Sequence, residues 1–394
     1  MKAISEKHNL LFATLQSLYW GSTCLSVSFL AIYLESQGYN KEQTGILFSS
    51  GAIAILIGQY FWGALCNRYG WLAHKQIIIF TMLIAIGFNA FFPTYIGNYL
   101  MIVGLFMLFN FTYYSMAPLI DAWTMARKLD SPSINYGLTR GFGSAVYALV
   151  AVIFGYILSV TDLEKMFIYS SIFIAMGMFV ALLIRPSRIE SEDRAIPISG
   201  FAMTIDLLKN IRFAILLVTL LFISTASMTN FTFYGLLITE LGGASYEFGI
   251  GMFINAMSQF VVMLMFASIA MKFSTQILLI CSFIALILKS LLLAWSTDLT
   301  FAIVSQVIDA VSFGLFLPAC IAYITQIVKK SETTIAIAAF GTMSTGIAGM
   351  IGNYLGGIVS QDYGIHSLFY VNAVLAAMGL AIFMLTFVVD RNKL

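Results

Sequence analysis

The chain has 394 residues, of which 60% are hydrophobic and 10% are charged, with a formal net charge of +2 and a mean hydropathy of +0.93. A soluble domain of this length could not cover so much apolar surface with so few charges, so the composition excludes a soluble globular protein. The small net charge and the lack of a basic block give no reason to expect a nucleic-acid partner.

Apolar runs long enough to cross a membrane occur twelve times, since a helix needs about 20 residues to cross a ~30 Å hydrocarbon core. The first run is too long for a cleaved signal peptide and is expected to be a retained span. The sequence predicts an all-α membrane protein with twelve transmembrane helices. The runs lie near residues 10–34, 43–66, 76–94, 98–125, 138–160, 165–184, 212–239, 246–271, 275–295, 300–328, 333–360 and 366–389.

One long polar connector, residues 185–211, divides the chain into two sets of six spans. It contains Pro186 and Pro197 and mixes both signs of charge. We therefore expect an N-terminal half over residues 1–184, a cytoplasmic linker over 185–211, and a C-terminal half over 212–394.

The two halves resemble each other weakly in sequence. A shift of 204 residues superposes Gly38 on Gly242, and Pro118 and Pro318 occupy comparable points of the fourth and tenth spans. A repeat of this kind predicts two pseudo-symmetric six-helix halves, with the substrate site near mid-membrane between them.

The basic residues are distributed unevenly across the predicted membrane. Of the 20 lysines and arginines, 16 fall on the side of the N-terminus, two on the other side and two within spans. Because lysine and arginine accumulate on the cytoplasmic side, both termini and the linker are expected in the cytoplasm. The termini are short and the sequons at Asn110 and Asn230 lie within spans, which favours a bacterial inner membrane.

Four strongly charged residues remain inside the spans: Asp121, Arg140, Lys289 and Asp309. Each half has one acid and one base, on consecutive spans. Two interpretations stay open, structural ion pairs between neighbouring helices or part of a solute and proton pathway. Buried ion pairs are poor stabilisers and charges within a membrane usually mark pathways, so we favour the second.

The fifth span presents a polar face around its arginine. Arg140, Ser144 and Tyr147 follow one another at i, i+4 and i+7, so they share one side of a helix. This face offers the guanidinium of Arg140, the hydroxyl of Ser144 and the aromatic ring of Tyr147, and together these groups suit a small polar solute.

Other spans carry polar faces that could either line a pathway or hold helices together. The first span offers Tyr19, Thr23 and Ser26. The eighth and tenth spans offer the polar residues Asn255, Gln259, Gln306 and Asp309.

No motif for an enzyme or a cofactor competes with a transport function. The three histidines lie near predicted loops, so no histidine cluster is available for a metal or for acid–base chemistry, and no Walker motif is present. We expect no catalytic residues, no metal and no cofactor.

The connector after the second span carries a recognisable pattern, Gly63-Ala-Leu-Cys-Asn67-Arg68-Tyr-Gly70-Trp71. It resembles Gly-x-x-x-Asp-Arg-x-Gly-Arg, the signature of the major facilitator superfamily. The resemblance implies the major facilitator fold, with Gly63, Asn67, Arg68 and Gly70 taking part in conformational gating. Because Asn67 replaces the acid and the trailing basic residue is absent, the gating contact is expected to be weaker here.

A second pattern, Tyr136-Gly-x-x-Arg140-x-Phe-Gly-Ser144-x-x-Tyr147, resembles the fifth-span motif of the oligosaccharide:proton symporter branch, which includes lactose permease and phenylpropionate-permease-like carriers. The resemblance implies that Arg140 pairs with Asp121 and that Tyr147, a tryptophan in that branch, stacks on a sugar ring.

The second half departs from that branch at the positions that handle protons. Lys289 replaces an arginine, Asp309 replaces a histidine, Gln259 replaces a glutamate, and the tenth-span glutamate falls at Ser312. Proton coupling is therefore expected at Asp309, tuned by Lys289 with Gln306 beside it, or at Asp121.

The sequence thus predicts a secondary transporter for proton-coupled uptake of a sugar, glycoside or similar small polar solute by alternating access, monomeric in the lipid bilayer. The alternatives are an exporter of drugs or other amphipathic compounds, a facilitator without coupling, and a non-transporting solute sensor. The predicted substrate-binding residues are Asp121, Arg140, Ser144, Tyr147, Asn255 and Gln259.

Overall fold

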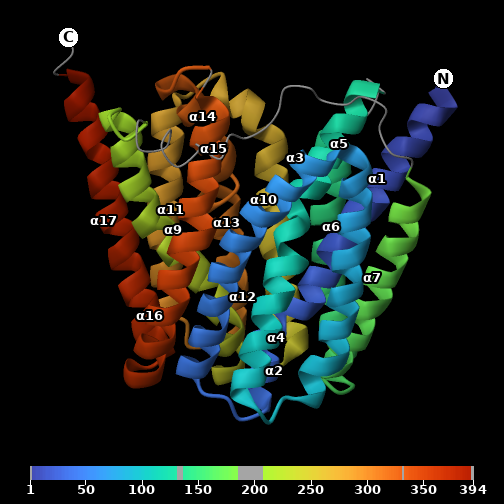
Figure 1. The fold of residues 1–394 in the computed structure, drawn as a ribbon. Helices are drawn as coiled ribbons and strands as arrows, with labels where there is room; N and C mark the ends of the chain where they lie inside the picture. Colours follow the sequence, from blue (N-terminus) through green and yellow to red (C-terminus); the bar gives the residue numbers. More distant parts are fainter. Residues whose placement is uncertain (1, 131–135, 185–206, 331, 392–394) are drawn as a thin grey trace. The chain divides into compact units, whose positions relative to one another are not determined.

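The computed structural model describes residues 2–130, 136–184, 207–330 and 332–391, and the regular secondary structure of these residues consists of helices, with no strand (Figure 1). Twelve spans among them are long and apolar enough to cross a membrane, which confirms the predicted number. The predicted ends agree with the observed ones to within a few residues. The spans are Asn9–Ser36, Lys41–Cys66, His74–Thr94, Tyr99–Met125, Tyr136–Ser159, Lys165–Leu183, Ile211–Glu240, Ser245–Ala270, Thr275–Ala294, Leu299–Ile327, Thr333–Tyr363 and Ile365–Phe387.

The chain forms two compact units. The first consists of Met1–Gln37 and Ile53–Ile196, and the second of Gly38–Ala52 and Pro197–Leu394. Residues 38–52 therefore cluster with the second unit, although they precede most of the first unit in sequence. The predicted linker over 185–211 lies outside the described residues as far as residue 206.

The first unit contains the helices of the first six spans. They are α1 (Lys2–Thr23), a π-helical turn (Cys24–Ser28), α2 (Leu30–Ser36), α3 (Lys41–Thr94, whose first turns belong to the second unit), α4 (Tyr99–Thr112), a 3₁₀ turn (Tyr114–Met116), α5 (Ala117–Asp130), α6 (Tyr136–Ser159) and α7 (Lys165–Leu183).

The second unit contains the helices of the last six spans. They are α9 (Ile211–Glu240), α10 (Ser245–Ala270), α11 (Thr275–Ala294), α12 (Leu299–Val304), a 3₁₀ turn (Ser305–Ile308), α13 (Asp309–Ser312), α14 (Phe316–Ile327), α15 (Thr333–Gly341), a π-helical turn (Thr342–Ile347), α16 (Ala348–Tyr363) and α17 (Ile365–Arg391).

The connector expected between the second and third spans is helical. Helix α3 continues without interruption from Lys41 to Thr94 and so includes residues 67–75. This segment contains no proline, and Gly70 is its only strong helix breaker. The gating pattern therefore lies on helical backbone instead of in a loop.

Glycines at matching positions end the first and the seventh span. Gly38 has a φ of 85° after α2, and Gly242 has a φ of 82° after α9. Glycine adopts this left-handed conformation without the steric cost that a Cβ would add, so it is the usual residue after the end of a helix. The two glycines that the weak repeat superposes thus have the same structural role.

In the first unit, α1 packs against both α6 and α7, and the three helices run side by side in Figure 1. Small residues allow this approach. A Cβ at Gly21 of α1 would lie 2.7 Å from the Phe173 ring of α7. The core beside these helices is aromatic, with the rings of Phe88 and Phe109 stacked at 4.3 Å.

In the second unit, α17 lies beside α9 and α11, as the red and yellow-green helices of Figure 1 show for the first pair. Buried polar groups join these three helices. Asn230 of α9 donates to Ser290 of α11 over 2.8 Å, and Asn372 of α17 donates to Asn230 over 2.9 Å. Such interhelical hydrogen bonds hold membrane helices together where hydrophobic burial gives no preference.

The fourth and tenth spans are both interrupted. A 3₁₀ turn separates α4 from α5, and a second one precedes α13, after which the chain turns again before α14. Pro118 and Pro318 lie in the first turn of the helix that follows each interruption, where a missing N–H costs little. These interruptions position the two acids, because Asp121 follows Pro118 by about one turn and Asp309 lies inside the second interruption.

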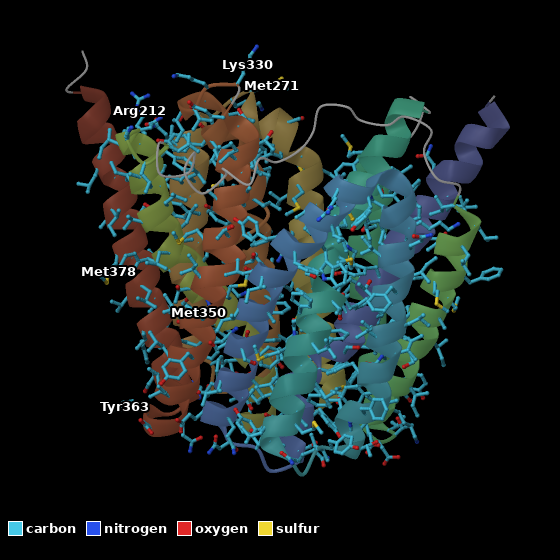
Figure 2. The ribbon with its side chains drawn as sticks, viewed as in Figure 1. Arg212, Met271, Lys330, Met350, Tyr363 and Met378 are labelled. Atoms are coloured by element: carbon cyan, nitrogen blue, oxygen red, sulfur yellow. The ribbon has the colours of Figure 1, made fainter. Side chains whose placement is uncertain are left out.

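Figure 2 labels residues at both ends of the second unit. Arg212, Met271 and Lys330 lie at one end, and Tyr363 lies at the other. This arrangement agrees with the predicted placement of Arg212 and Lys330 on one side of the membrane. Which side faces the cytoplasm stays a prediction.

Candidate functional site

The first unit brings Asp121 of α5 and Arg140 of α6 together. Arg140 Nε lies 4.0 Å from Asp121 Oδ1, and the two side chains are 32% and 30% exposed. This separation is longer than the 2.7–2.9 Å typical of a closed charge-assisted hydrogen bond. The two charges are therefore neighbours that make no hydrogen bond to each other, and both side chains remain partly accessible.

Two neighbours of Asp121 hydrogen-bond to its carboxylate. Gln16 Nε2 of α1 donates to Asp121 Oδ1 over 2.7 Å, and the side chain of Tyr136 also hydrogen-bonds to Asp121. Gln16 is buried. Asp121 is thus held from two sides, by the first and the fifth span.

An indole ring lies against Arg140. The Arg140 guanidinium carbon is 4.3 Å from the centre of the Trp20 ring, and Trp20 Nε1 donates to Gln16 Oε1 over 3.1 Å. Among the residues that the structure describes, the guanidinium makes no hydrogen bond. We refer to Gln16, Trp20, Asp121, Tyr136 and Arg140 as the unit-1 cluster.

The other two predicted residues of this face contribute less directly. The hydroxyl of Tyr147 lies 2.7 Å from Ser28 Oγ in the π-helical turn of the first span. Ser144 is half-buried and makes no side-chain hydrogen bond within the described part of the chain. Since Tyr147 is about 10 Å along the helix axis from Arg140, the aromatic ring beside the cation is that of Trp20.

The polar face predicted for the first span belongs to the interior of the unit. Tyr19 donates to the carbonyl of Tyr114, over 2.9 Å, where the fourth span is interrupted. Ser26 donates to Asn89 over 3.2 Å. Gln16 and Trp20 lie on a neighbouring face of the same span, and the sequence pattern did not predict them as site residues. Their i, i+4 spacing was the available signal, but the sequence alone does not say which face of α1 meets Arg140.

The second unit contains a tighter polar cluster. Lys289 of α11 and Asp309 of α13 form an ion pair through Asp309 Oδ2, and their side chains are only 7% and 6% exposed. Asn255 of α10 donates to the same oxygen, and Ser312 donates to Asp309 Oδ1 over 2.7 Å. Three donors therefore surround the Asp309 carboxylate.

Two glutamines complete this arrangement. Gln259 donates to Asn255 Oδ1 over 2.9 Å, and Gln306 Oε1 accepts from Asn255 over 3.2 Å. Within the described residues, the buried Nε2 of Gln306 has no hydrogen-bond partner. We refer to Asn255, Gln259, Lys289, Gln306, Asp309 and Ser312 as the unit-2 cluster. It is closed and buried, whereas the unit-1 cluster is partly open.

Of the residues predicted to take part in gating, Gly63 and Arg68 show few contacts. Arg68 is exposed and lies 5.7 Å from the ring of its neighbour Tyr69. A Cβ at Gly63 would meet nothing within 4 Å. The side chain of Asn67 and the surroundings of Gly70 lie outside the described part of the structure.

The described residues also contain no group of three or more histidine, cysteine, aspartate or glutamate side chains that could hold a metal ion. Neither cluster therefore offers a set of metal ligands, and their chemistry is that of hydrogen bonds and paired charges.

Residues 12–371 match the model of the MFS_1 like family. The chain belongs to this family. It is 22% identical over 376 residues to the transporter YwbF of Bacillus subtilis (strain 168), a match that covers 93% of this chain and 90% of the relative. It is also 23% identical over 365 residues to a maltose permease of Geobacillus stearothermophilus, covering 90% and 89% of the two chains.

Solved structures of transporters share the fold. A point mutant of the nucleoside transporter NupG superposes with a TM-score of 0.85 at 16% identity, covering 97% of this chain and all of that one. The human organic anion transporter MFSD10 superposes with a TM-score of 0.67 at 13% identity, and the match covers 96% of this chain and 99% of that one. Together with the family, these likenesses identify a multi-pass membrane transport protein of the major facilitator type and not an enzyme.

Proposed function

We propose that this protein is a proton-coupled carrier that takes up an uncharged, hydroxyl-rich solute by alternating access, and that the solute binds at the unit-1 cluster. The candidates are sugars, glycosides and nucleosides. The observation that carries the proposal is the open pair of Arg140 and Asp121, which leaves a donor and an acceptor side by side and partly accessible.

The chemistry of this pair suits hydroxyl groups. A hydroxyl both donates and accepts, so it can accept from the Arg140 guanidinium while it donates to the Asp121 carboxylate. The planar fork of arginine presents two parallel donors, which matches two neighbouring oxygens on a ring. The adjacent Trp20 indole adds an apolar surface to the same site.

Charge balance favours a neutral solute. Arg140 lies beside Asp121 and Lys289 pairs with Asp309, so the cation of each cluster is matched by an acid. An organic anion or cation would leave one charge of the cluster uncompensated in a poorly hydrated site, which is costly. This argument supports a sugar-like or nucleoside-like solute over an ionic one.

The names of two similar proteins agree with this class. One relative is a maltose permease and one fold neighbour is a nucleoside transporter. Maltose and uridine are both neutral and both carry vicinal hydroxyls, and they are the probes that we would test first.

We propose Asp309 as the proton carrier. Its carboxylate accepts from Lys289, Asn255 and Ser312, so a proton that binds there has to displace at least one of these donors. Protonation would then accompany separation of Lys289 from Asp309, which couples the proton to a change in the unit-2 cluster.

Proton symport is tested by external pH in a weakly buffered suspension of de-energised cells that express the protein. Addition of the transported solute should make the medium more alkaline, because protons enter with it. Asp309→Asn should abolish the alkalinisation, whereas Asp362→Asn, an exposed helical aspartate, should preserve it. Uptake without a pH change would indicate a facilitator, and competition by hydrophobic cations in place of sugars and nucleosides would indicate an exporter.

A further inference from the structure

Arg140 and Asp121 do not form a close contact, although their opposite charges attract each other. Two opposite charges on partly exposed, rotatable side chains gain by forming a short, bidentate contact. Here the nearest approach, from Arg140 Nε to Asp121 Oδ1, is 4.0 Å. Some other contact therefore holds the two side chains apart.

Gln16 fixes the position of the Asp121 carboxylate through a hydrogen bond. Its amide nitrogen donates to Asp121 Oδ1, the oxygen that faces Arg140, over 2.7 Å. Its amide oxygen accepts from Trp20 over 3.1 Å, so both ends of the amide are engaged and its orientation is fixed. The side chain is only 1% exposed, which leaves it no alternative partner in water.

Trp20 fixes the position of the Arg140 guanidinium through a cation–π contact. The guanidinium lies over its ring at 4.3 Å, a distance at which a cation is attracted to an indole face. The ring is itself fixed, by its hydrogen bond to Gln16 and by the edge-on ring of Tyr19 at 5.3 Å and 89°.

The space for this ring depends on a glycine of α6. A Cβ at Gly143 would lie 2.8 Å from Trp20 Cδ1, closer than real side-chain contacts allow. The Trp20 ring can therefore occupy its place only because residue 143 has no side chain.

We propose that Gln16 and Trp20 are positioning residues that keep Arg140 and Asp121 apart, so that a solute with vicinal hydroxyls can bind between them. This inference rests on the proposed function. It adds two residues to the binding site and names the chemical feature that the site selects. A solute that lacks one of the two hydroxyls would leave Arg140 or Asp121 without a partner, which sites of this kind reject strongly.

The first test measures transport of maltose and uridine by the full-length protein in proteoliposomes. Gln16→Met, which keeps the length but removes both hydrogen bonds, should raise the KM of the transported probe by about tenfold or more, with a smaller change in the maximal rate. 2′-Deoxyuridine should be discriminated from uridine less well by this variant than by the wild type.

Gly143 allows a matched comparison. Gly143→Ala should raise KM as Trp20→Phe does, because the first displaces the indole from Arg140 and the second replaces it with a smaller ring. The double variant should be no worse than Trp20→Phe alone, since the two changes act on the same contact. Gly104→Ala, at an exposed helical glycine of α4 where a Cβ meets nothing within 4 Å, should behave as the wild type.

The second test needs no solute. Phenylglyoxal modifies arginine, and mass spectrometry of the peptide that contains Arg140 gives the rate at this residue. In Gln16→Met the freed Asp121 should close onto Arg140 and slow the modification several-fold, while Gly104→Ala should leave the rate unchanged. An unchanged rate in Gln16→Met would overturn the inference.

The two tests distinguish the proposed class of solute from the proposed positioning role of Gln16 and Trp20. If the wild type transports neither probe and Arg140 is still protected in Gln16→Met, the choice of solute is wrong and the positioning role stands. If the wild type transports a probe and the variants match it in both KM and modification rate, the proposed function stands and the positioning role is wrong.

Discussion

Lys289 and Asp309 form an ion pair whose side chains are 7% and 6% exposed, whereas Arg140 and Asp121 are about one-third exposed and 4.0 Å apart. Two pairs that look equivalent in sequence therefore differ in physical character. In the buried pair the Asp309 carboxylate accepts from three donors, whereas in the partly exposed pair both side chains remain accessible to a further ligand. The difference predicts opposite responses to mutation.

Removing one partner of the buried pair should destabilise the protein. Lys289→Met would leave the Asp309 carboxylate buried without its cation, at a cost of about 3–5 kcal/mol. Thermal unfolding of the purified protein in detergent should show a clear loss of stability. Lys165→Met, which removes a 42% exposed lysine paired with Asp162, should cost less than about 1 kcal/mol.

The double variant Lys289→Met/Asp309→Leu separates stability from transport. Replacing both charges with apolar side chains removes the uncompensated charge, so most of the lost stability should return. Transport coupled to protons should not return. Recovery of coupled transport would exclude Asp309 as the proton carrier.

The variant Arg140→Lys should take up the solute poorly, although it keeps the positive charge. A lysine cannot present two parallel donors and stacks less well on Trp20, so uptake should fall by about tenfold or more. Because the site is partly exposed, the unfolding temperature should change little. Wild-type uptake by Arg140→Lys would show that only charge is needed at this position.

The two glycines with left-handed backbone should each be intolerant of a side chain. Gly38→Ala and Gly242→Ala place a Cβ at φ values of 85° and 82°, which costs about 1–2 kcal/mol each. Gly97→Ala is the control, since Gly97 lies in a turn without a positive φ and with nothing within 4 Å of its Cβ. Equal stability of the three variants would contradict the assignment of a shared role to Gly38 and Gly242.

The start of α3 should be equally sensitive at Gly45. A Cβ there would collide with the carbonyl oxygen of Asn353 and lie 2.7 Å from Gly357 Cα of α16. Gly45→Val should therefore loosen residues 38–52 from α16, where Ser49 donates to the carbonyl of Met350 over 2.8 Å. A cysteine at Ser49 should then react faster with a maleimide than it does in a Gly87→Val control, because nothing lies within 4 Å of a Cβ at Gly87.

Much of the fold could be predicted because membrane spans are encoded locally. Twelve apolar runs give twelve spans, and the high cost of an unpaired charge in lipid marks Asp121, Arg140, Lys289 and Asp309 as residues of interest. The helical backbone of residues 67–75 was missed, because polar composition and a glycine indicate a turn but do not require one.

The candidate site was less predictable, because it depends on which faces of distant helices meet. Tyr147 shares a predicted face with Arg140, yet its hydroxyl contacts Ser28. Trp20 and Gln16 lie more than 100 residues from Asp121 and Arg140, and no local pattern connects them. Helical periodicity gives the faces of one helix, but the rotation of α1 against α5 and α6 is fixed by packing.

The close contact between Trp20 and residue 143 has a consequence for the descent of this protein. Since a Cβ at position 143 would collide with the indole, a lineage that replaced Gly143 would first have to replace Trp20 with a smaller residue, or lose the ring's contact with Arg140. Positions 20 and 143, far apart in the gene, are therefore expected to covary, with a tryptophan at position 20 accompanied by a glycine at position 143.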